Sequence, residues 1–268
     1  MSVPTRQTRP DKWPECGGNS VNAIYILWLR ELKRYFRSRA MMIASLGQPL
    51  LYLLVLGFGL GPVFQRAGNG SYIQFVAPGI IGMSVLFTSV FSGIGLLWDR
   101  QFGFLKETLV APVPRVAIMI GKTLGGATVA TIQGLIVLVI CLIAGFRPVN
   151  WLLLPLAILV MILTAFVFAG LGVAIGSRLQ DIQGMQLIMN FLVLPIYFLS
   201  GALFPLTGLP SVLAFFTRID PLSYGVDALR NYLLGASVFA PELSIAVLVG
   251  VALLFVVYGG YSFSKIQI

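Results

Sequence analysis

The side chains able to do chemistry are few in this sequence, and they form no complete catalytic set. All nine acidic residues fall between long apolar runs or at their ends, and histidine is absent. A hydrolase embedded in a membrane needs an acid and a base near its substrate, and a proton-coupled carrier needs an ionisable group within the apolar interior. The sequence therefore argues against both kinds of protein.

A tripeptide resembles the end of a phosphate-binding loop. Gly121-Lys122-Thr123 has the required residue types, but the position where such a loop needs its first glycine is occupied by Val116. The tripeptide also opens a long apolar run, whereas a phosphate loop connects a strand to a helix in water. We interpret Lys122 as a lysine that extends from the start of a membrane helix toward the surface.

Metal and nucleic-acid binding are also disfavoured. Cys16 lies in the amino-terminal tail and Cys141 within an apolar run, and neither has a cysteine or histidine nearby to share a metal ion. The net charge of +9 would suggest nucleic acid for a soluble protein, but the lysines and arginines gather at the ends of apolar runs. We therefore expect no cofactor in this chain and no nucleic-acid partner.

The composition points to a membrane protein. Hydrophobic residues make up 58% and charged residues 10% of the chain, whereas soluble domains carry about 25% charged residues. A helix of roughly 20 apolar residues crosses a bilayer. The sequence predicts an all-α polytopic membrane protein with six transmembrane helices, at about 41–62, 75–98, 118–146, 151–175, 183–204 and 243–263.

The distribution of basic residues predicts the orientation. An even number of spans places both termini on one side, and that side would hold fourteen of the eighteen lysines and arginines. The other side would hold only Arg66, Arg147, Arg218 and Arg230. Because cytoplasmic loops carry the excess of basic residues, we expect a multi-pass protein of the plasma (inner) membrane with both termini in the cytoplasm.

The segment before the first span is amphipathic. After a tail at 1–19, residues 20–39 carry an apolar stripe on one helical face and basic residues on another; these are Ile24, Trp28, Leu32 and Tyr35 against Arg30, Arg34 and Arg37. This pattern favours a helix on the cytoplasmic membrane surface, in contact with lipid. The alternative is a basic run beside the membrane that only sets the topology.

The outer segment 205–241 predicts two short helices. Apolar stretches at 209–216 and 222–234 are separated by Arg218, Asp220 and Pro221, and each is too short to cross about 30 Å of hydrocarbon. We expect them to re-enter the membrane or to lie over the outer mouth. The alternative is a seventh, interrupted crossing.

Small and polar residues predict helix contacts within the membrane. Gly57 and Gly61, Gly121 and Gly125, and Gly172 and Gly176 have the spacing that lets helix backbones approach closely. The fifth span is the most mixed in polarity, so it should face protein or a cavity. Its Asn190 could line a cavity or bond a neighbouring helix.

Two blocks of sequence resemble a known family. The first is Asp99-Arg100-Gln101-Phe102-Gly103-Phe104-Leu105-Lys106-Glu107-Thr108-Leu109-Val110-Ala111-Pro112-Val113-Pro114-Arg115, followed by Gly121-Lys122; the second holds Ser200-Gly201, Phe204-Pro205, Asp220-Pro221-Leu222 and Tyr224. Together they resemble the membrane subunit of ABC-2 type ATP-binding-cassette exporters, the group of the daunorubicin-resistance and nodulation lipo-oligosaccharide permeases. The resemblance covers nearly the whole chain. Gln101 departs from it, since many relatives carry glutamate there.

The resemblance implies partners and coupling residues. Two copies of a separate ABC ATPase would bind the ATP and Mg²⁺, and a second copy of this permease, as a homodimer, or a close relative would complete the transporter. The loop 99–117 would contact the ATPase through Phe104, Leu105, Lys106, Glu107 and Leu109. The amphipathic helix would touch the same partner through Arg30, Glu31 and Arg34.

The resemblance also implies a non-catalytic transport role. The chain would move an amphipathic, drug-like, lipid or lipid-linked saccharide substrate outward, along a path lined by Phe87, Phe91, Met189, Asn190 and Tyr197. One alternative is a membrane-embedded lipid-modifying transferase, for which Asp220 and Asp227 would be the acids. Another is a membrane scaffold that transports nothing.

Overall fold

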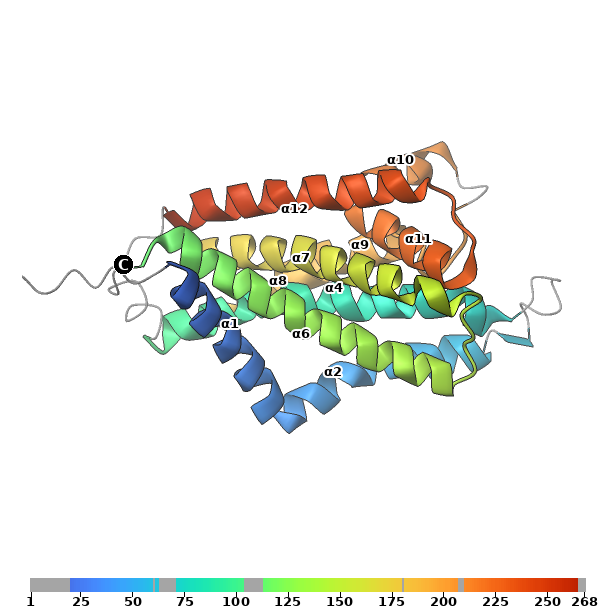
Figure 1. Cartoon of the computed structure of the whole chain (residues 1–268), viewed down its shortest axis with the longest axis horizontal. Coiled ribbons are helices and arrows are strands. Elements are labelled where there is room, and N and C mark those ends of the chain that lie inside the picture. Colours follow the sequence, from blue (N-terminus) through green and yellow to red (C-terminus); the bar gives the residue numbers. More distant parts are fainter. Residues whose placement is uncertain are drawn as a thin grey trace, which may run out of the picture.

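The computed structural model describes residues 20–59, 61–62, 71–103, 113–179, 181–206 and 210–264. Over these ranges the chain forms helices and no strand, so the all-α prediction is confirmed (Figure 1). In the described parts, five helices are long and apolar enough to cross a membrane. A sixth is added if the bent pair Ser20–Arg37 and Met42–Phe58, which meet at 72°, is one span.

A helix lies at each of the six predicted spans. In chain order these helices are α2 (Arg39–Tyr52) with η1 (Leu53–Phe58), α4 (Tyr72–Gln101), α6 (Arg115–Ile143), η2 (Trp151–Leu153) with α7 (Leu154–Arg178), α8 (Ile182–Ile188) with η3 (Met189–Val193) and α9 (Leu194–Leu199), and α12 (Pro241–Ser264). Before them lies α1 (Ser20–Arg37), and between α9 and α12 lie α10 (Ser211–Ile219) and α11 (Pro221–Leu234).

Local sequence signals explain several helix boundaries. Asp181 caps α8 by accepting a hydrogen bond from the Gly184 amide at 3.0 Å, and Gly235 ends α11 with a φ of 72° that favours glycine. Pro195 has no amide hydrogen, and its ring would clash with the carbonyl four residues earlier. The helix widens there into the π-helical turn η3, which relieves that clash.

The centre of the bundle is the contact between α4 and α7. A Cβ added at Gly93 would lie 2.1 Å from the Gly172 carbonyl oxygen, and one at Gly172 would lie 2.5 Å from that of Val90. A Cβ at Gly176 would lie 2.6 Å from the Gly93 carbonyl oxygen. Only glycine permits backbones this close, so the close approach predicted for Gly172 and Gly176 is confirmed.

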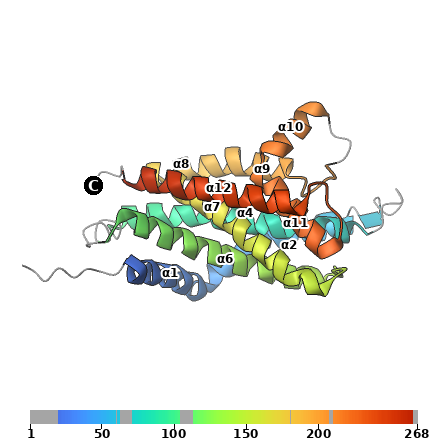
Figure 2. The ribbon, with the colours of Figure 1, turned by 45° about the horizontal axis from the view of Figure 1, so that its top comes forward.

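The amphipathic helix α1 runs beside the first half of α6 (Figure 2). A Cβ at Gly121 would lie 2.9 Å from the Leu27 Cβ, and one at Gly125 would lie 2.7 Å from the Glu31 Cβ. This second glycine pair is therefore also a close contact. A Cβ at Gly61, by contrast, would meet no described atom within 4 Å, so a close contact at that position stays a prediction.

Hydrogen bonds fix the apolar stripe of α1 against α6. The Trp28 indole donates to the Thr128 hydroxyl at 3.0 Å, and the Tyr35 hydroxyl donates to the Gln133 side-chain oxygen. The structure thus assigns part of the stripe to a protein contact. A position of α1 along the membrane surface stays a prediction.

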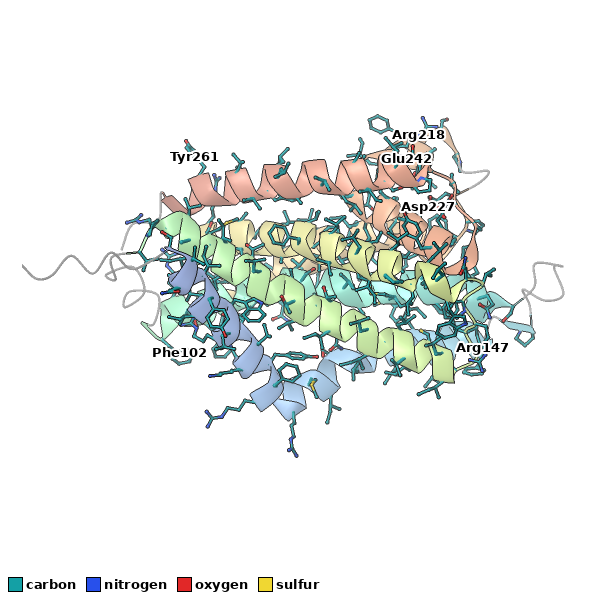
Figure 3. The ribbon with its side chains drawn as sticks, viewed as in Figure 1. Phe102, Arg147, Arg218, Asp227, Glu242 and Tyr261 are labelled. Carbon is teal, nitrogen blue, oxygen red and sulfur yellow. The ribbon has the colours of Figure 1, made fainter. Side chains whose placement is uncertain are left out.

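Two short helices, α10 and α11, lie between α9 and α12, where the sequence predicts them. At 14 residues, α11 is about 21 Å long, shorter than about 30 Å of hydrocarbon. It inserts into the bundle, since Gly82 of α4 meets the Val226 side chain and Gly225 meets Thr164 of α7. Arg147, Arg218, Asp227 and Glu242 lie at this end of the bundle, and Phe102 and Tyr261 lie at the other (Figure 3).

Candidate functional site

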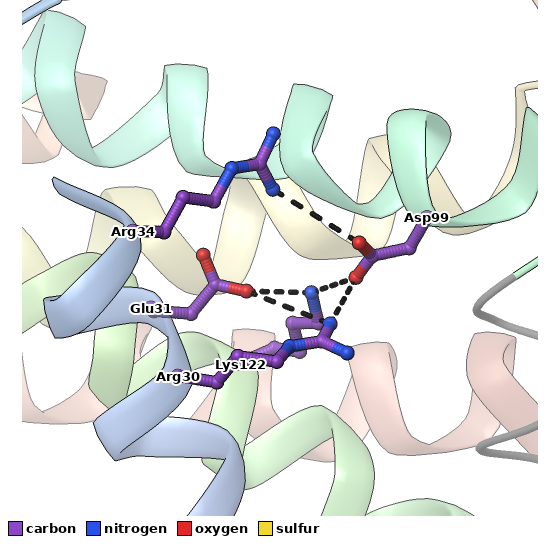
Figure 4. Close-up of polar contacts among 5 residues, drawn as sticks. All are labelled: Arg30, Glu31, Arg34, Asp99 and Lys122. Carbon is purple, nitrogen blue, oxygen red and sulfur yellow. Dashed lines mark hydrogen bonds and ion pairs between the residues drawn. The ribbon is translucent and has the colours of Figure 1, made fainter. Parts of the chain in front are cut away.

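A cluster of five charged side chains joins α1, α4 and α6 (Figure 4). The Lys122 ammonium donates to the Glu31 carboxylate at 2.6 Å and to Asp99. The Arg30 guanidinium also donates to Asp99, while Arg34 lies 4.0 Å from the same carboxylate. Three helices far apart in sequence are thereby held at one point.

Lys122 is the buried centre of this cluster. Its side chain is only 4% exposed, so our interpretation of a lysine that extends to the membrane surface is wrong. Removing an ammonium from water costs several kcal/mol unless carboxylates and hydrogen bonds replace the water. Glu31 and Asp99 supply that replacement, which explains why the lysine turns inward.

The cluster stands at both ends of the predicted coupling loop. Asp99 lies in the last turn of α4, before the loop, and Lys122 lies in the second turn of α6, after it. The predicted coupling residues Phe104, Leu105, Lys106, Glu107 and Leu109 lie outside the described residues. The contact between Asp99 and Lys122 therefore ties together the two helices that lead into and out of the loop.

Arg30, Glu31 and Arg34, expected to touch an ATPase, all take part in this cluster. The Glu31 side chain is 14% exposed and is paired with Lys122. The side chains of Arg30 and Arg34 are 38% and 41% exposed, so both retain surface for another contact. The structure thus gives the three residues an internal role that the sequence did not indicate.

A cavity of about 380 Å³ lies among α1, α2, α4 and α6. Its lining combines aromatic and hydroxyl-bearing side chains with Glu31 and Arg34 of the cluster. Phe87 and Phe91, both predicted for the substrate path, belong to this lining, and their rings stack at 6.5 Å. The size falls within the range of about 300–1,000 Å³ that small-molecule sites occupy.

The other residues predicted for the substrate path lie in different places relative to the cavity. Tyr197 is buried beside the cavity wall, with its ring 6.4 Å from that of Phe87. Met189 is 2% exposed in the core, and Asn190 lies on an exposed face of the described bundle. Neither Met189 nor Asn190 lines the cavity, so the structure brings only Phe87, Phe91 and Tyr197 together.

The two acids that the transferase alternative would use, Asp220 and Asp227, have structural partners. Asp227 is 1% exposed and accepts hydrogen bonds from the backbone amides of Val238 and Phe239, the latter at 2.8 Å. Asp220 caps α11 by accepting from the Leu222 amide at 2.9 Å. Among the described residues, no three acids, cysteines or histidines are grouped so that they could hold a metal ion.

Arg230 is a buried cation at the same end of the bundle. Its guanidinium donates to the Gly201 carbonyl oxygen at 3.1 Å and lies 4.3 Å from the centre of the Phe75 ring. Burial lowers the pKa of Arg230, while neighbouring Asp227 opposes that shift. The contacts of Arg230 and Asp227 fix α11 to α4 and to the segment that precedes α12.

Fold and site together define a polytopic helical membrane protein with a cavity beside a buried charge cluster. The sequence profile of the family described as ABC-2 type transporter matches residues 22–234. The chain belongs to the ABC-2 type transporter family. It is a transport permease without catalytic function of its own, and its family implies an ABC ATPase as partner.

Individual relatives agree with this assignment. The chain is 32% identical to Nodulation protein J of Rhizobium leguminosarum bv. trifolii over 221 residues, which cover 81% of this chain and 83% of that protein. It is 30% identical to Nodulation protein J of Rhizobium meliloti (strain 1021) over 78% of this chain and 80% of that protein. It is 27% identical to the inner membrane transport permease YadH of Escherichia coli (strain K12) over 88% of this chain and 90% of that protein.

Proposed function

We propose that the chain is the membrane subunit of an ATP-driven exporter. It moves an amphipathic, drug-like, lipid or lipid-linked saccharide substrate from the cytoplasm or inner leaflet outward. Two permeases, as a homodimer or with a close relative, work with two ATPase subunits that bind ATP and Mg²⁺. The assembly lies in the plasma (inner) membrane with both termini of the permease in the cytoplasm.

The observation that carries this proposal is the contact between Asp99 and Lys122. It connects the helices on either side of the coupling loop and, through Glu31 and Arg30, binds them to α1. A push on the loop by closing ATPases moves these helices together. The cavity wall formed by α1, α4 and α6 moves with them, which links ATP hydrolysis to the substrate space.

The coupling residues are tested by co-purification with the ATPase and by ATP-dependent movement of a labelled amphipath in proteoliposomes. Glu107→Arg and Leu109→Asp change the charge and the apolar anchor of the proposed ATPase contact. We expect both variants to lose the ATPase and the transport, with Lys33→Gln on the exposed face of α1 as a matched control. Wild-type association and transport in both variants would show that the loop does not couple.

The same preparation separates this function from the scaffold alternative. A scaffold would show no ATP-dependent movement of any substrate, even with the ATPase present. An ATPase variant without its phosphate-loop lysine is the control for movement that does not need hydrolysis. Equal movement with this variant and with the intact ATPase would overturn the exporter assignment.

A further inference from the structure

The cavity among α1, α2, α4 and α6 has two chemically different ends. One end lies at the charge cluster, where a Cβ at Gly95 would be 3.2 Å from the Arg34 guanidinium. The other end is formed by Met83, Ser84 and Phe87 near the middle of α4. The helical rise separates Ser84 from Gly95 by about 16 Å. The cavity thus runs from the end of a membrane span to its apolar centre.

The charge cluster behind this end carries an excess of positive charge, although only Glu31 and Arg34 of the cluster line the cavity itself. The three cations of the cluster, Arg30, Arg34 and Lys122, face only two carboxylates, Glu31 and Asp99. Lys122 and Arg30 make the close contacts with these acids. Arg34 lies 4.0 Å from Asp99, beyond hydrogen-bond distance, and this is its closest contact with an acid in the described parts of the chain.

The deep end is apolar but includes a hydroxyl without a partner. The rings of Phe87 and Phe91 line the wall, and Trp98 is 41% exposed at the charged end. Ser84 is 2% exposed, and its hydroxyl has no hydrogen-bond partner among the described residues. A water molecule in the cavity can satisfy such a hydroxyl, so Ser84 marks how deep the cavity reaches and does not identify the ligand.

We propose that this cavity binds an amphipathic molecule with an anionic headgroup. Arg34 contacts the headgroup, and the apolar chain lies along Phe87 and Phe91 toward Ser84. The inference rests on the proposed function, because it names the substrate class of the exporter. A cationic amphipath is the competing ligand, since aromatic rings also attract cations. Glu31, the acid that would favour it, is already paired with Lys122 at 2.6 Å.

The test measures binding to the purified full-length permease without an ATPase. The probes are three single-chain amphipaths of equal chain length with phosphate, phosphocholine and trimethylammonium headgroups, each with a nitroxide on the chain that quenches tryptophan fluorescence. Trp98→Phe identifies the part of the quenching that arises in the cavity. We expect the phosphate probe to reach half of its maximal Trp98-dependent quenching at about a tenfold lower concentration than the other two probes. A tenfold difference in affinity is the effect expected of one charge-assisted contact.

Variants assign the preference to particular residues. Arg34→Gln should remove the preference for the phosphate probe, Arg34→Lys should retain it, and Arg37→Gln on the exposed part of α1 should leave it unchanged. Ser84→Leu, which fills the deep end, should weaken all three probes alike. Thermal unfolding shows whether each variant folds. If Arg34→Gln does not fold, Arg34→Lys still tests whether a positive charge at this position gives the phosphate preference.

Several results would overturn the proposal. These are equal binding of the three probes, a preference for trimethylammonium, and a phosphate preference that survives in Arg34→Gln. Displacement of the probe by inorganic phosphate alone would show a site for free anions and would also count against it. Binding is measured without ATP, whereas export needs the ATPase. Probe binding without ATP-driven movement would therefore refute the exporter function but not the binding site. Movement of other substrates without probe binding refutes only the site.

Discussion

The ammonium of Lys122 donates a hydrogen bond to the Asp99 carboxylate, joining the second turn of α6 to the last turn of α4. The two residues flank the loop that we propose as the ATPase contact. Because Glu31 accepts from the same ammonium, α1 is held at this point as well. A single buried cation thus sets the mutual position of three helices.

Replacing this cation should destabilise the permease. Lys122→Met keeps most of the length of the side chain but leaves Glu31 without its 2.6 Å partner and weakens the pairing of Asp99. We expect a loss of about 3–5 kcal/mol in the free energy of unfolding, as for other broken buried ion pairs. Thermal unfolding in detergent measures it, with Lys33→Met on the exposed face of α1 as the control.

A double variant tests whether the loss comes from the pair. Asp99→Asn combined with Lys122→Met removes both charges, so the combined loss should be smaller than the sum of the two single losses. Strictly additive losses would show that Lys122 and Asp99 do not stabilise each other.

The backbone contact between α4 and α7 should tolerate no added side-chain atom. Gly172→Ala places a Cβ 2.5 Å from the Val90 carbonyl oxygen, so the helices must move apart. We expect destabilisation of about 1–3 kcal/mol or more. Gly250→Ala is the control, because a Cβ there meets no described atom within 4 Å and alanine favours the helix. Equal unfolding temperatures for the two variants would contradict the contact.

The helices could be predicted from the sequence because long apolar runs with polar ends are a local property. The α2, α4, α6, α7 and α12 runs each end near a charge or a turn residue, so their bounds follow within a few residues. The glycine pair at 172 and 176 was recognisable for the same reason. Spacing along one helix predicts which face can approach a neighbour.

The charge cluster could not be predicted in this way. Lys122 and Glu31 are 91 residues apart, and only the packing of α1 against α6 brings them together. The exposed place of Asn190 in this single chain could not be predicted for a related reason, and its role in the substrate path stays a prediction. Helical periodicity separates the faces of the fifth span but does not say which of them meets the rest of the chain.

Removing the Asp227 carboxylate should loosen the segment before α12. Asp227→Ala deprives the partly buried amides of Val238 and Phe239 of their acceptor, so each loss should be smaller than the about 1–3 kcal/mol that a fully buried donor costs. Hydrogen exchange of these two amides should accelerate. Asp227→Asn retains one acceptor and should show a smaller effect, and Glu242→Gln on the exposed start of α12 should show none. Unchanged exchange in Asp227→Ala would contradict the assignment.

Asp220 predicts a pH dependence of stability. This residue lies between α10 and α11, outside the candidate spans, where burial raises its pKa to about 7 against the opposing hydrogen bonds from Leu222 and Ser223. An unfolded aspartate has a pKa of about 3.9. Between these values the folded state keeps a proton that the unfolded state has lost, so the free energy of unfolding falls as pH rises and levels off above about 7.

Thermal unfolding from pH 4 to 8 measures this slope. Asp220→Asn keeps an N-cap acceptor but carries no titrating proton, so this fall should disappear in the variant. A fall of equal size in wild type and variant would assign the pH dependence to another group.

The glycine contact between α4 and α7 also provides a frame of reference. Helices whose backbones meet without side chains between them cannot slide or rotate past each other without losing that fit. A spin label on an exposed position of α4 or α7 therefore stays fixed relative to both helices. Distances from this label to a second label on α1, α10 or α12 then report the displacement of that helix alone. The α4–α7 pair thus provides a fixed internal reference for measuring helix movements during one transport cycle.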